Sequence, residues 1–286
     1  MIIDCHTHIF PQAIRDQRDA YFPGEPAFEL LYRSPKARLI GVDDLVARMD
    51  TDGVDRAVVF GFPWQHMDTT RRNNDYVLEA VSRYPDRLTG FCCLDPASSE
   101  AEAETVRCLE AGLGGVGELA FYQSGIDEAA LDQLEPVMAV CRRFDVPVMI
   151  HTNEPVGHLY PGKTPNTLRQ LYRMVKRFDA NRLILAHWGG GLLFYLLLKK
   201  EVSDVLAHVA FDTAASPFLY RPDMYRLACE IAGPEKILLG SDYPLLPAER
   251  YFRDMDAAGL DPAARQAVCG DNAARVLKLP ESKAES

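Results

Sequence analysis

Eight short apolar runs recur along this chain of 286 residues, and segments with helical periodicity lie between them. Each run is predicted to form a strand, over Ile2–Cys5, Arg56–Phe60, Leu88–Cys93, Gly115–Leu119, Val146–Ile150, Leu183–Ala186, Val209–Asp212 and Ile237–Leu239. Charged and apolar residues alternate at three- and four-residue spacing between the strands, which predicts helices. These are Val42–Met49, Asp75–Tyr84, Glu100–Ala111, Ala129–Arg143 and Thr167–Phe178. Strands joined by helices pair in parallel, because a parallel crossover needs a dozen or more residues.

Repeats of this kind close most naturally into a single-domain α/β fold, the (β/α)8 or TIM barrel, here over residues 1–278. The alternative is an open doubly wound sheet, whose usual sign is a glycine-rich phosphate turn after the first strand. The corresponding turn here, Cys5-His6-Thr7-His8, has no glycine, so we favour the barrel. Residues 11–39 are an insertion rich in aromatic side chains, and we expect a lid over the active site, with a purely structural cover as the alternative. The polar tail, residues 279–286, is predicted to be disordered.

Charge and cysteine content restrict the classes of partner. The net charge is -10, which argues against binding duplex nucleic acid or an anionic membrane surface. The seven cysteines are scattered without a CxxC pair, as expected for a reduced, cytoplasmic protein. The longest uncharged apolar stretch, residues 183–198, is shorter than the ~20 residues that a membrane-spanning helix needs. We therefore expect a small-molecule substrate.

Metal-ligand residues follow the strands of the predicted barrel. His6 and His8 are two residues apart, so in a strand both imidazoles point to the same face. His151, His187 and Asp242 each follow an apolar run, where the carboxyl ends of barrel strands form the functional face. Imidazoles with one carboxylate match the ligands of catalytic zinc, which keeps a position open for water. The sequence therefore predicts a divalent metal, with zinc as the expected ion and one or two ions per chain.

The same residues resemble a known family, the amidohydrolase superfamily, and within it the amidohydrolase-related (family 2) branch. Besides the histidines and Asp242, the resemblance rests on the segments Asn74-Asp75, Tyr84-Pro85-Asp86-Arg87, Gly240-Ser241-Asp242-Tyr243-Pro244 and Gly270-Asp271-Asn272-Ala273, and it covers about Met1 to Leu277. It implies that His6, His8 and His151 bind metal. It also implies that Asp242 binds metal and moves a proton, and that His187 either binds a second ion or polarises the substrate.

Glu118 departs from many decarboxylases of this branch, which have no carboxylate at the fourth strand. Its Gly117-Glu118 pair is similar to that of TatD-type metal-dependent nucleases, and this resemblance implies a carboxylate that bridges two ions. A buried carboxylate is costly without a cation nearby, which favours a ligand. The alternative is a glutamate paired with an arginine or a backbone donor.

Further candidates surround this centre. In the loop of residues 153–163, His158, Tyr160 and Lys163 are expected to bind an anionic group of the substrate, with Lys163 as a point charge. Trp64, after the second strand, is expected to form an aromatic wall of the pocket. The apolar run of residues 192–198 is expected to be the buried face of a helix, with a contact in a homo-oligomer as the alternative.

These features predict a metal-dependent hydrolase, in which metal-activated water attacks an ester, lactone, amide or phosphoester bond. Asp242 would act as general base and acid, and His187 would assist. A first alternative is a metal-dependent decarboxylase resembling aminocarboxymuconate-semialdehyde decarboxylase. A second is a TatD-like nuclease, and a third is a barrel that binds metal or a partner without catalysis.

Overall fold

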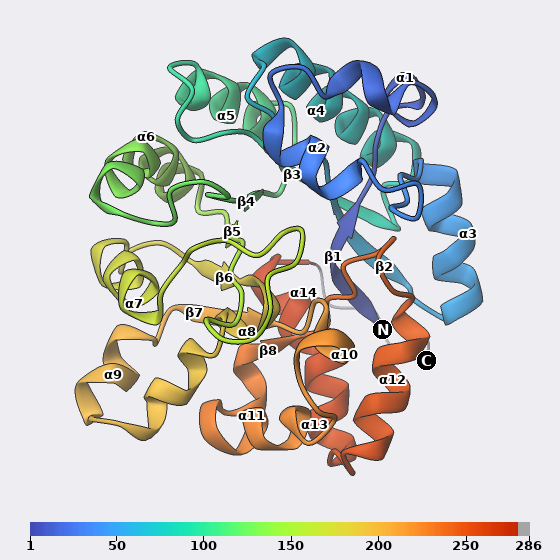
Figure 1. Ribbon diagram of the computed structural model, residues 1–286. Coiled ribbons are helices and arrows are strands. Elements are labelled where there is room, and N and C mark those ends of the chain that lie inside the picture. The colour runs from blue at the N-terminus through green and yellow to red at the C-terminus, as the bar shows by residue number, and fades with distance from the viewer. Residues whose placement is uncertain (280–286) are drawn as a thin grey trace.

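Eight parallel strands form one sheet in the order β1 to β8 in the computed structural model, which describes residues 1–279 (Figure 1). The strands are β1 Ile3–His8, β2 Arg56–Phe60, β3 Leu88–Cys92, β4 Gly115–Leu119, β5 Val148–Ile150, β6 Leu183–Leu185, β7 Val209–Asp212 and β8 Ile237–Leu238. Hydrogen bonds then join the segment after β8 to β1, from Cys5 N to Leu239 O (2.7 Å) and from His8 N to Tyr243 O (2.8 Å). The barrel prediction is confirmed.

Helices surround the strands on the outside of the barrel (Figure 1). The longer ones are α3 Val42–Asp52, α4 Met67–Arg83, α5 Ala101–Glu110, α6 Glu128–Phe144, α7 Leu168–Arg177, α11 Met224–Ala232 and α12 Ala248–Ala257. The shorter segments are α1 Gln12–Asp16, η1 Arg18–Tyr21, α2 Pro26–Tyr32, α8 Ala186–Gly189, η2 Leu192–Leu197, α9 Lys200–Val205, α10 Ser216–Leu219, η3 Pro234–Lys236, α13 Pro262–Gln266, η4 Ala267–Asp271 and α14 Asn272–Val276. An ion pair between Arg48 and Glu249 (3.7 Å) connects α3 to the start of α12.

Alternation along the strands divides the core into two layers. In β2, Ala57 and Val59 pack outward against the helices, whereas Val58 and Phe60 fill the barrel interior. The Phe60 ring lies 5.1 Å from the ring of His6, so the interior layer supports the candidate site from below. Strand β1 extends to His8, beyond the predicted end at Cys5, because Thr7 and His8 also pair with β2. The two histidines therefore lie inside a strand, which fixes their direction.

The insertion of residues 11–39 is a folded segment that contains α1, η1 and α2. Its side chains join a buried cluster of Phe10, Ile14, Phe28, Phe62 and Trp64. The insertion is tied to the loop after β2, because the Glu25 carboxylate accepts hydrogen bonds from the amides of Gln65 (2.9 Å) and His66 (2.8 Å). Opening and closing of this cover stays a prediction.

Two expectations about individual segments need correction. The run of residues 192–198 forms a 3-10 turn, in which Leu192 and Leu193 are buried but Leu197 and Leu198 are 66% and 65% exposed, so it is not a buried helix face. The end of the chain packs further than predicted, since Leu279 contacts the inner core layer and its amide donates to Ala274 O. The rest of the predicted tail, residues 280–286, lies outside the described residues.

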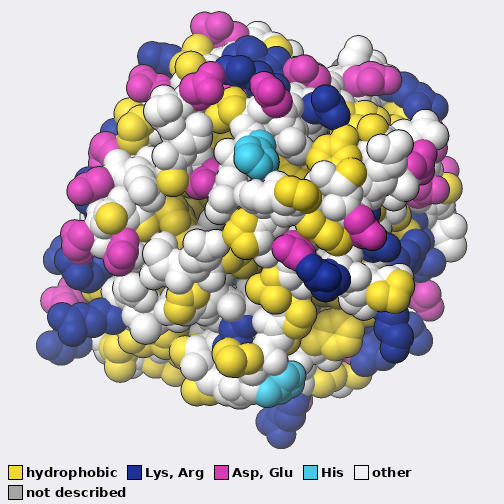
Figure 2. Space-filling model, turned by 45° about the horizontal axis from the view of Figure 1, so that its top comes forward, with side chains coloured by type: hydrophobic (Ala, Val, Ile, Leu, Met, Phe, Trp, Pro, Cys, Tyr) yellow, Lys and Arg dark blue, Asp and Glu magenta, His cyan; other side chains and the backbone are white. Residues whose placement is uncertain are grey.

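The surface carries charges of both signs. Figure 2 shows that, on the face in view, Lys and Arg alternate with Asp and Glu around the edge, while hydrophobic and uncharged groups fill most of the middle. No helix within residues 1–279 combines the length and apolar character needed to cross a bilayer.

Candidate metal centre

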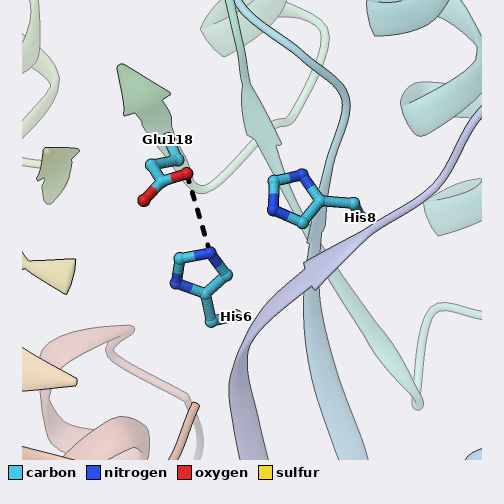
Figure 3. Close-up of side chains that lie close together, drawn as sticks. All are labelled: His6, His8 and Glu118. Carbon is cyan, nitrogen blue, oxygen red and sulfur yellow. Dashed lines mark ion pairs between the residues drawn. The ribbon is translucent and has the colours of Figure 1, made fainter. Parts of the chain in front are cut away.

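The carboxyl ends of five strands bring the predicted ligand residues together. His6 and His8 project from β1 toward Glu118 at the end of β4, as Figure 3 shows. His151, His187 and Asp242 follow β5, β6 and β8. Ligand atoms lie within 4.8 Å of one another in three overlapping groups: His6, His8 and Glu118; His6, His187 and Asp242; and Glu118, His151 and His187. All six predicted residues thus share one centre.

Two carboxylates organise the imidazoles. Glu118 Oε1 lies 3.0 Å from His151 Nδ1 and 3.4 Å from His187 Nε2, and its Oε2 lies 3.7 Å from His6 Nε2. Figure 3 draws the last of these contacts. The alternative of an arginine partner for Glu118 is wrong, because its partners are imidazoles.

Asp242, in the segment after β8 that pairs with β1, provides the second carboxylate. Its Oδ1 lies 3.3 Å from His8 Nε2 and 3.7 Å from His6 Nε2. His6 therefore lies between the two carboxylates, with its Nε2 equally far from both. An ion placed at this nitrogen would be within reach of both acids.

Acceptors behind the centre fix the orientation of three rings. The Nδ1 atoms of His6, His8 and His187 lie 2.9 to 3.0 Å from Asp212 Oδ2, Gly61 O and Ala214 O. An Nδ1–H that donates to such an acceptor leaves the Nε2 lone pair free to bind a metal. His151 has the opposite orientation, since its Nε2 faces Gly162 O (2.8 Å) and its Nδ1 faces the centre.

Electrostatics favour positive charge at this position. Burial opposes protonation of His6, but Glu118 and Asp212 outweigh it and raise the pKa of His6 to about 10. Burial likewise opposes protonation of His187, yet Glu118 raises its pKa to about 9. The effect of burial on Glu118 is outweighed by His151 and His6, which hold the pKa of that carboxyl well below its ordinary value. The site therefore stabilises either imidazolium protons or a cation that replaces them.

A buried nitrogen without a partner tests whether the residues fit a metal. His6 Nε2 is buried and, among residues 1–279, has no hydrogen-bond partner. This nitrogen also lies 3.7 Å from a carboxylate oxygen of Glu118 and 3.7 Å from one of Asp242, so an ion bound to it would meet two acidic groups. Imidazole and carboxylate together suit zinc, manganese or iron in the divalent state. The donor set fits a divalent metal.

Backbone strain occurs at two of the candidate residues. His187 and Asp242 have φ angles of 55° and 59°, in the left-handed region that favours glycine. Such a conformation costs on the order of 1–3 kcal/mol per residue and tends to occur at functional sites. At His187 it turns the chain directly after β6, so that the imidazole returns over the barrel, and three glycines continue the turn.

The predicted substrate-binding residues have different surroundings from the candidate metal ligands. Lys163 Nζ is 2.8 Å from Glu154 Oε1 and also contacts the carbonyl oxygens of Val156 and His158, so its charge is already paired. Tyr160 donates its hydroxyl to the same Glu154 carboxylate (2.7 Å). The His158 side chain belongs to an exposed residue of this loop. In this conformation Lys163 does not offer a free point charge.

Trp64 also has a different environment from the one expected. It has no exposed surface, packs 4.3 Å from the ring of Phe28, and donates its indole N–H to Asn73 Oδ1 (3.1 Å). The indole therefore supports the insertion from below. Tyr122, which the sequence does not single out, lies beside a candidate ligand: its ring is 5.4 Å from that of His151 and stacks on Phe62, which also contacts Tyr32 of the insertion.

Asp212 is a further functional candidate that the sequence analysis missed. It ends β7, is fully buried, and contacts His6. The available signal was its place at the carboxyl end of a predicted strand, the same position that singled out the ligands.

Known proteins resemble this chain over nearly its whole length. The gamma-resorcylate decarboxylase of Rhodococcus jostii is 25% identical, with 94% of this chain and 95% of that protein covered. The L-fucono-1,5-lactonase of Burkholderia ambifaria is 22% identical, with 97% and 95% covered. The crystal structure of a dihydroxybenzoic acid decarboxylase from Polaromonas sp. JS666, with bound manganese and 2-nitroresorcinol, superposes with a TM-score of 0.72 at 20% identity, over 98% of both chains.

One further comparison agrees with the fold, with the candidate ligands at the strand ends, and with the similarity to known proteins over nearly the whole chain. The sequence model of the amidohydrolase family matches residues 3–279. The match includes all six predicted metal-site residues and the insertion. The chain belongs to the amidohydrolase family.

Proposed function

We propose that this protein is a metal-dependent decarboxylase of small hydroxylated aromatic acids. The sequence alone favours hydrolysis. Two of the three relatives described above are decarboxylases, however, so we place decarboxylation first. The observation of this chain that carries the proposal is the position of His187, whose Nε2 lies 3.4 Å from Glu118 Oε1 beside the metal-ligand cluster. Decarboxylation of an aromatic acid requires a proton donor at that place.

We assign one divalent ion to His6, His8, His151 and Asp242. A bound ion would hold and neutralise the oxygen atoms of the substrate and so orient its ring. Manganese is as compatible with this ligand set as zinc, and it is the ion bound in the Polaromonas structure. In this assignment Glu118 binds no metal, and its charge serves to keep His187 protonated.

His187 would donate its Nε2 proton to the ring carbon that carries the carboxylate. The carbon–carbon bond then breaks, carbon dioxide leaves, and the bonding electrons restore the aromatic ring. The product keeps the donated proton, and His187 regains a proton from solvent. In the metal-free site, Glu118 outweighs the opposing effect of burial and raises the pKa of His187 to about 9, which favours the protonated form that a general acid requires.

An anionic substrate also needs a cation, and Arg38 is our candidate in place of Lys163. Its guanidinium lies 5.6 Å from the ring centroid of Tyr243, the residue after the ligand Asp242. Arg38 is exposed, and no carboxylate oxygen among residues 1–279 lies within 4.0 Å of it. It therefore offers an unpaired positive charge at the rim between β1 and the segment after β8.

Carbon dioxide release tests the proposal. Metal-loaded protein would be given 2,6-dihydroxybenzoate, 5-carboxyvanillate and 6-methylsalicylate, with gas and phenolic product measured together. We expect equal amounts of both products from at least one acid, and none after removal of the metal. Turnover of lactones with no carbon dioxide from any aromatic acid would contradict the proposal.

Lactone hydrolysis is the second candidate, and two observations favour it. A lactonase is among the relatives, and Glu118 with His151 and His187 forms a second group of potential ligands. Two bound ions would support water activation at a bridged pair. The nuclease alternative has no comparable support, because none of the relatives described above is a nuclease and the net charge is -10.

A further inference from the structure

Asp212 divides its two oxygens between different kinds of donor. Oδ2 lies 2.9 Å from Nδ1 of His6, and this contact is completely buried. Oδ1 accepts the backbone amides of His187 (2.9 Å) and Ala214 (2.9 Å). One carboxylate therefore touches the central ligand His6 and also holds the strained turn that carries His187.

The two amides fix which oxygen faces which partner. An amide N–H can only donate, so the atom at the Oδ1 position has to be an acceptor. The other atom of the side chain then necessarily faces the imidazole of His6. Because Nδ1 is held as a donor by Oδ2, the Nε2 lone pair of His6 points to the centre between Glu118 and Asp242.

Close packing leaves Asp212 and His6 little freedom to move apart or rotate. Gly240, after β8, lies against both residues, and a Cβ there would lie 2.9 Å from the Cβ of His6 and 3.3 Å from that of Asp212. Only a residue without a side chain fits at this place. The contact between His6 and Asp212 is therefore enclosed by the backbone after β8 as well as by β1 and β7.

We propose that Asp212 is a positioning residue that holds His6 in the form that binds metal through Nε2, and that couples this ligand to the turn of His187. The inference rests on the metal centre of the proposed function and goes beyond it, because Asp212 is not one of the assigned ligands and contacts His6 at Nδ1. A carboxylate behind a metal-binding histidine contributes about 10- to 100-fold to metal affinity.

Two variants of the full chain separate positioning from a merely structural role. In Asp212→Asn, the amide oxygen stays with the two backbone donors, so the side-chain NH2 faces His6 Nδ1. When His6 binds metal through Nε2, its Nδ1 carries a proton, so the Nδ1–H of His6 and the NH2 group of Asn face each other as two donors. In Asp212→Ala, His6 loses its acceptor but meets no opposing donor, whereas both backbone amides lose their partner. We expect Asn to weaken metal affinity more than Ala, and Ala to lower the melting temperature more than Asn.

The experiment measures Zn²⁺ affinity by competition with a chromophoric chelator, and melting temperature for each metal-free variant. Asp4→Asn is the matched control: Asp4 is another buried carboxylate of the barrel, bonded to Ser241 and to the backbone of His6 but to no imidazole. We expect Zn²⁺ affinity to fall at least about tenfold in Asp212→Asn and less than about threefold in Asp4→Asn. Nitrogen NMR of the Zn²⁺ form should also show the His6 Nδ1 proton in the parent protein.

Two results would overturn the inference. One is Zn²⁺ affinity of Asp212→Asn within about threefold of the parent protein. The other is a Zn²⁺ affinity that falls in the same order as the melting temperature, so that Asp212→Ala binds Zn²⁺ more weakly than Asp212→Asn. Both measurements use metal without substrate, so a failure to release carbon dioxide would refute the proposed function and leave this test standing.

Discussion

The replacement Glu118→Gln removes the negative charge that contacts three imidazoles of the centre, and it keeps the size of the side chain. Glu118 Oε1 lies 3.4 Å from Nε2 of His187, and the pKa of His187 is raised to about 9. The rise above the ordinary value of ~6.5 corresponds to about 3 kcal/mol. One ion pair at this distance contributes about 5 kcal/mol at an effective dielectric constant of ~20. Burial opposes the rise, so the charge of Glu118 has to outweigh burial as well, and Asp242 adds to its effect.

We expect Glu118→Gln to lower the pKa of His187 in the metal-free protein toward ~6.5. The protonated fraction at pH 8 would then fall by at least about tenfold. Titration of the histidine ring protons by NMR measures both values. Glu154→Gln is the matched control, because Glu154 is a carboxylate of the same barrel face that contacts Lys163 and Tyr160 but none of the ligand histidines. We expect the control to leave the pKa of His187 unchanged.

The same variant also tests the assignment of one ion. If Glu118 acts through His187, Glu118→Gln keeps the metal content of the parent protein, and its rate loss diminishes as the pH is lowered toward 6. An unchanged pKa of His187 would refute the electrostatic reasoning. A loss of one metal equivalent would show that Glu118 is a ligand.

Three further outcomes are expected. His6→Ala should retain less than about a tenth of the bound metal, measured by elemental mass spectrometry, because its Nε2 lies between both carboxylates; full metal content would count against the ligand assignment. Arg38→Ala should raise KM for an anionic acid about tenfold or more at unchanged metal content. Arg33 is a surface cation near Phe22, and Arg33→Ala should leave KM unchanged. If Arg38→Ala has the same KM as the parent protein, Arg38 does not bind the substrate anion. The raised pKa values of His6 and His187 stabilise the metal-free protein fully below ~6.5, and this stabilisation is lost as the pH rises through about 9 to 10. Its melting temperature should therefore fall between pH 7 and pH 10, and a rise would contradict the assigned charges.

The barrel was predictable because strand signals depend on local sequence. Runs such as residues 56–60 and 115–119 have the observed bounds, since apolar residues flanked by turns leave little choice of boundary. The end of β1 was missed because His6, Thr7 and His8 are polar, and their strand conformation depends on pairing with β2. Local pattern cannot reveal that pairing.

The candidate site was predictable where one strand end was enough to identify a residue. His151, Glu118 and Asp242 stand out for that reason. Asp212 also ends a strand, β7, and its contact with His6 in the structure is what distinguishes it from other strand-end residues. Lys163 shows the opposite error. A lysine in a loop gives no sign of its partner, and here Glu154, nine positions earlier, already pairs with its charge.

Metal content per chain tests the central claim most directly. The protein would be purified, loaded with manganese or zinc, freed of loosely bound ions, and quantified by elemental mass spectrometry against protein concentration. We predict about one equivalent, held by His6, His8, His151 and Asp242, with His187 left to supply the proton and Glu118 to keep His187 protonated. About two equivalents would contradict this account and move lactone hydrolysis to first place, and no bound metal under any loading condition would refute it.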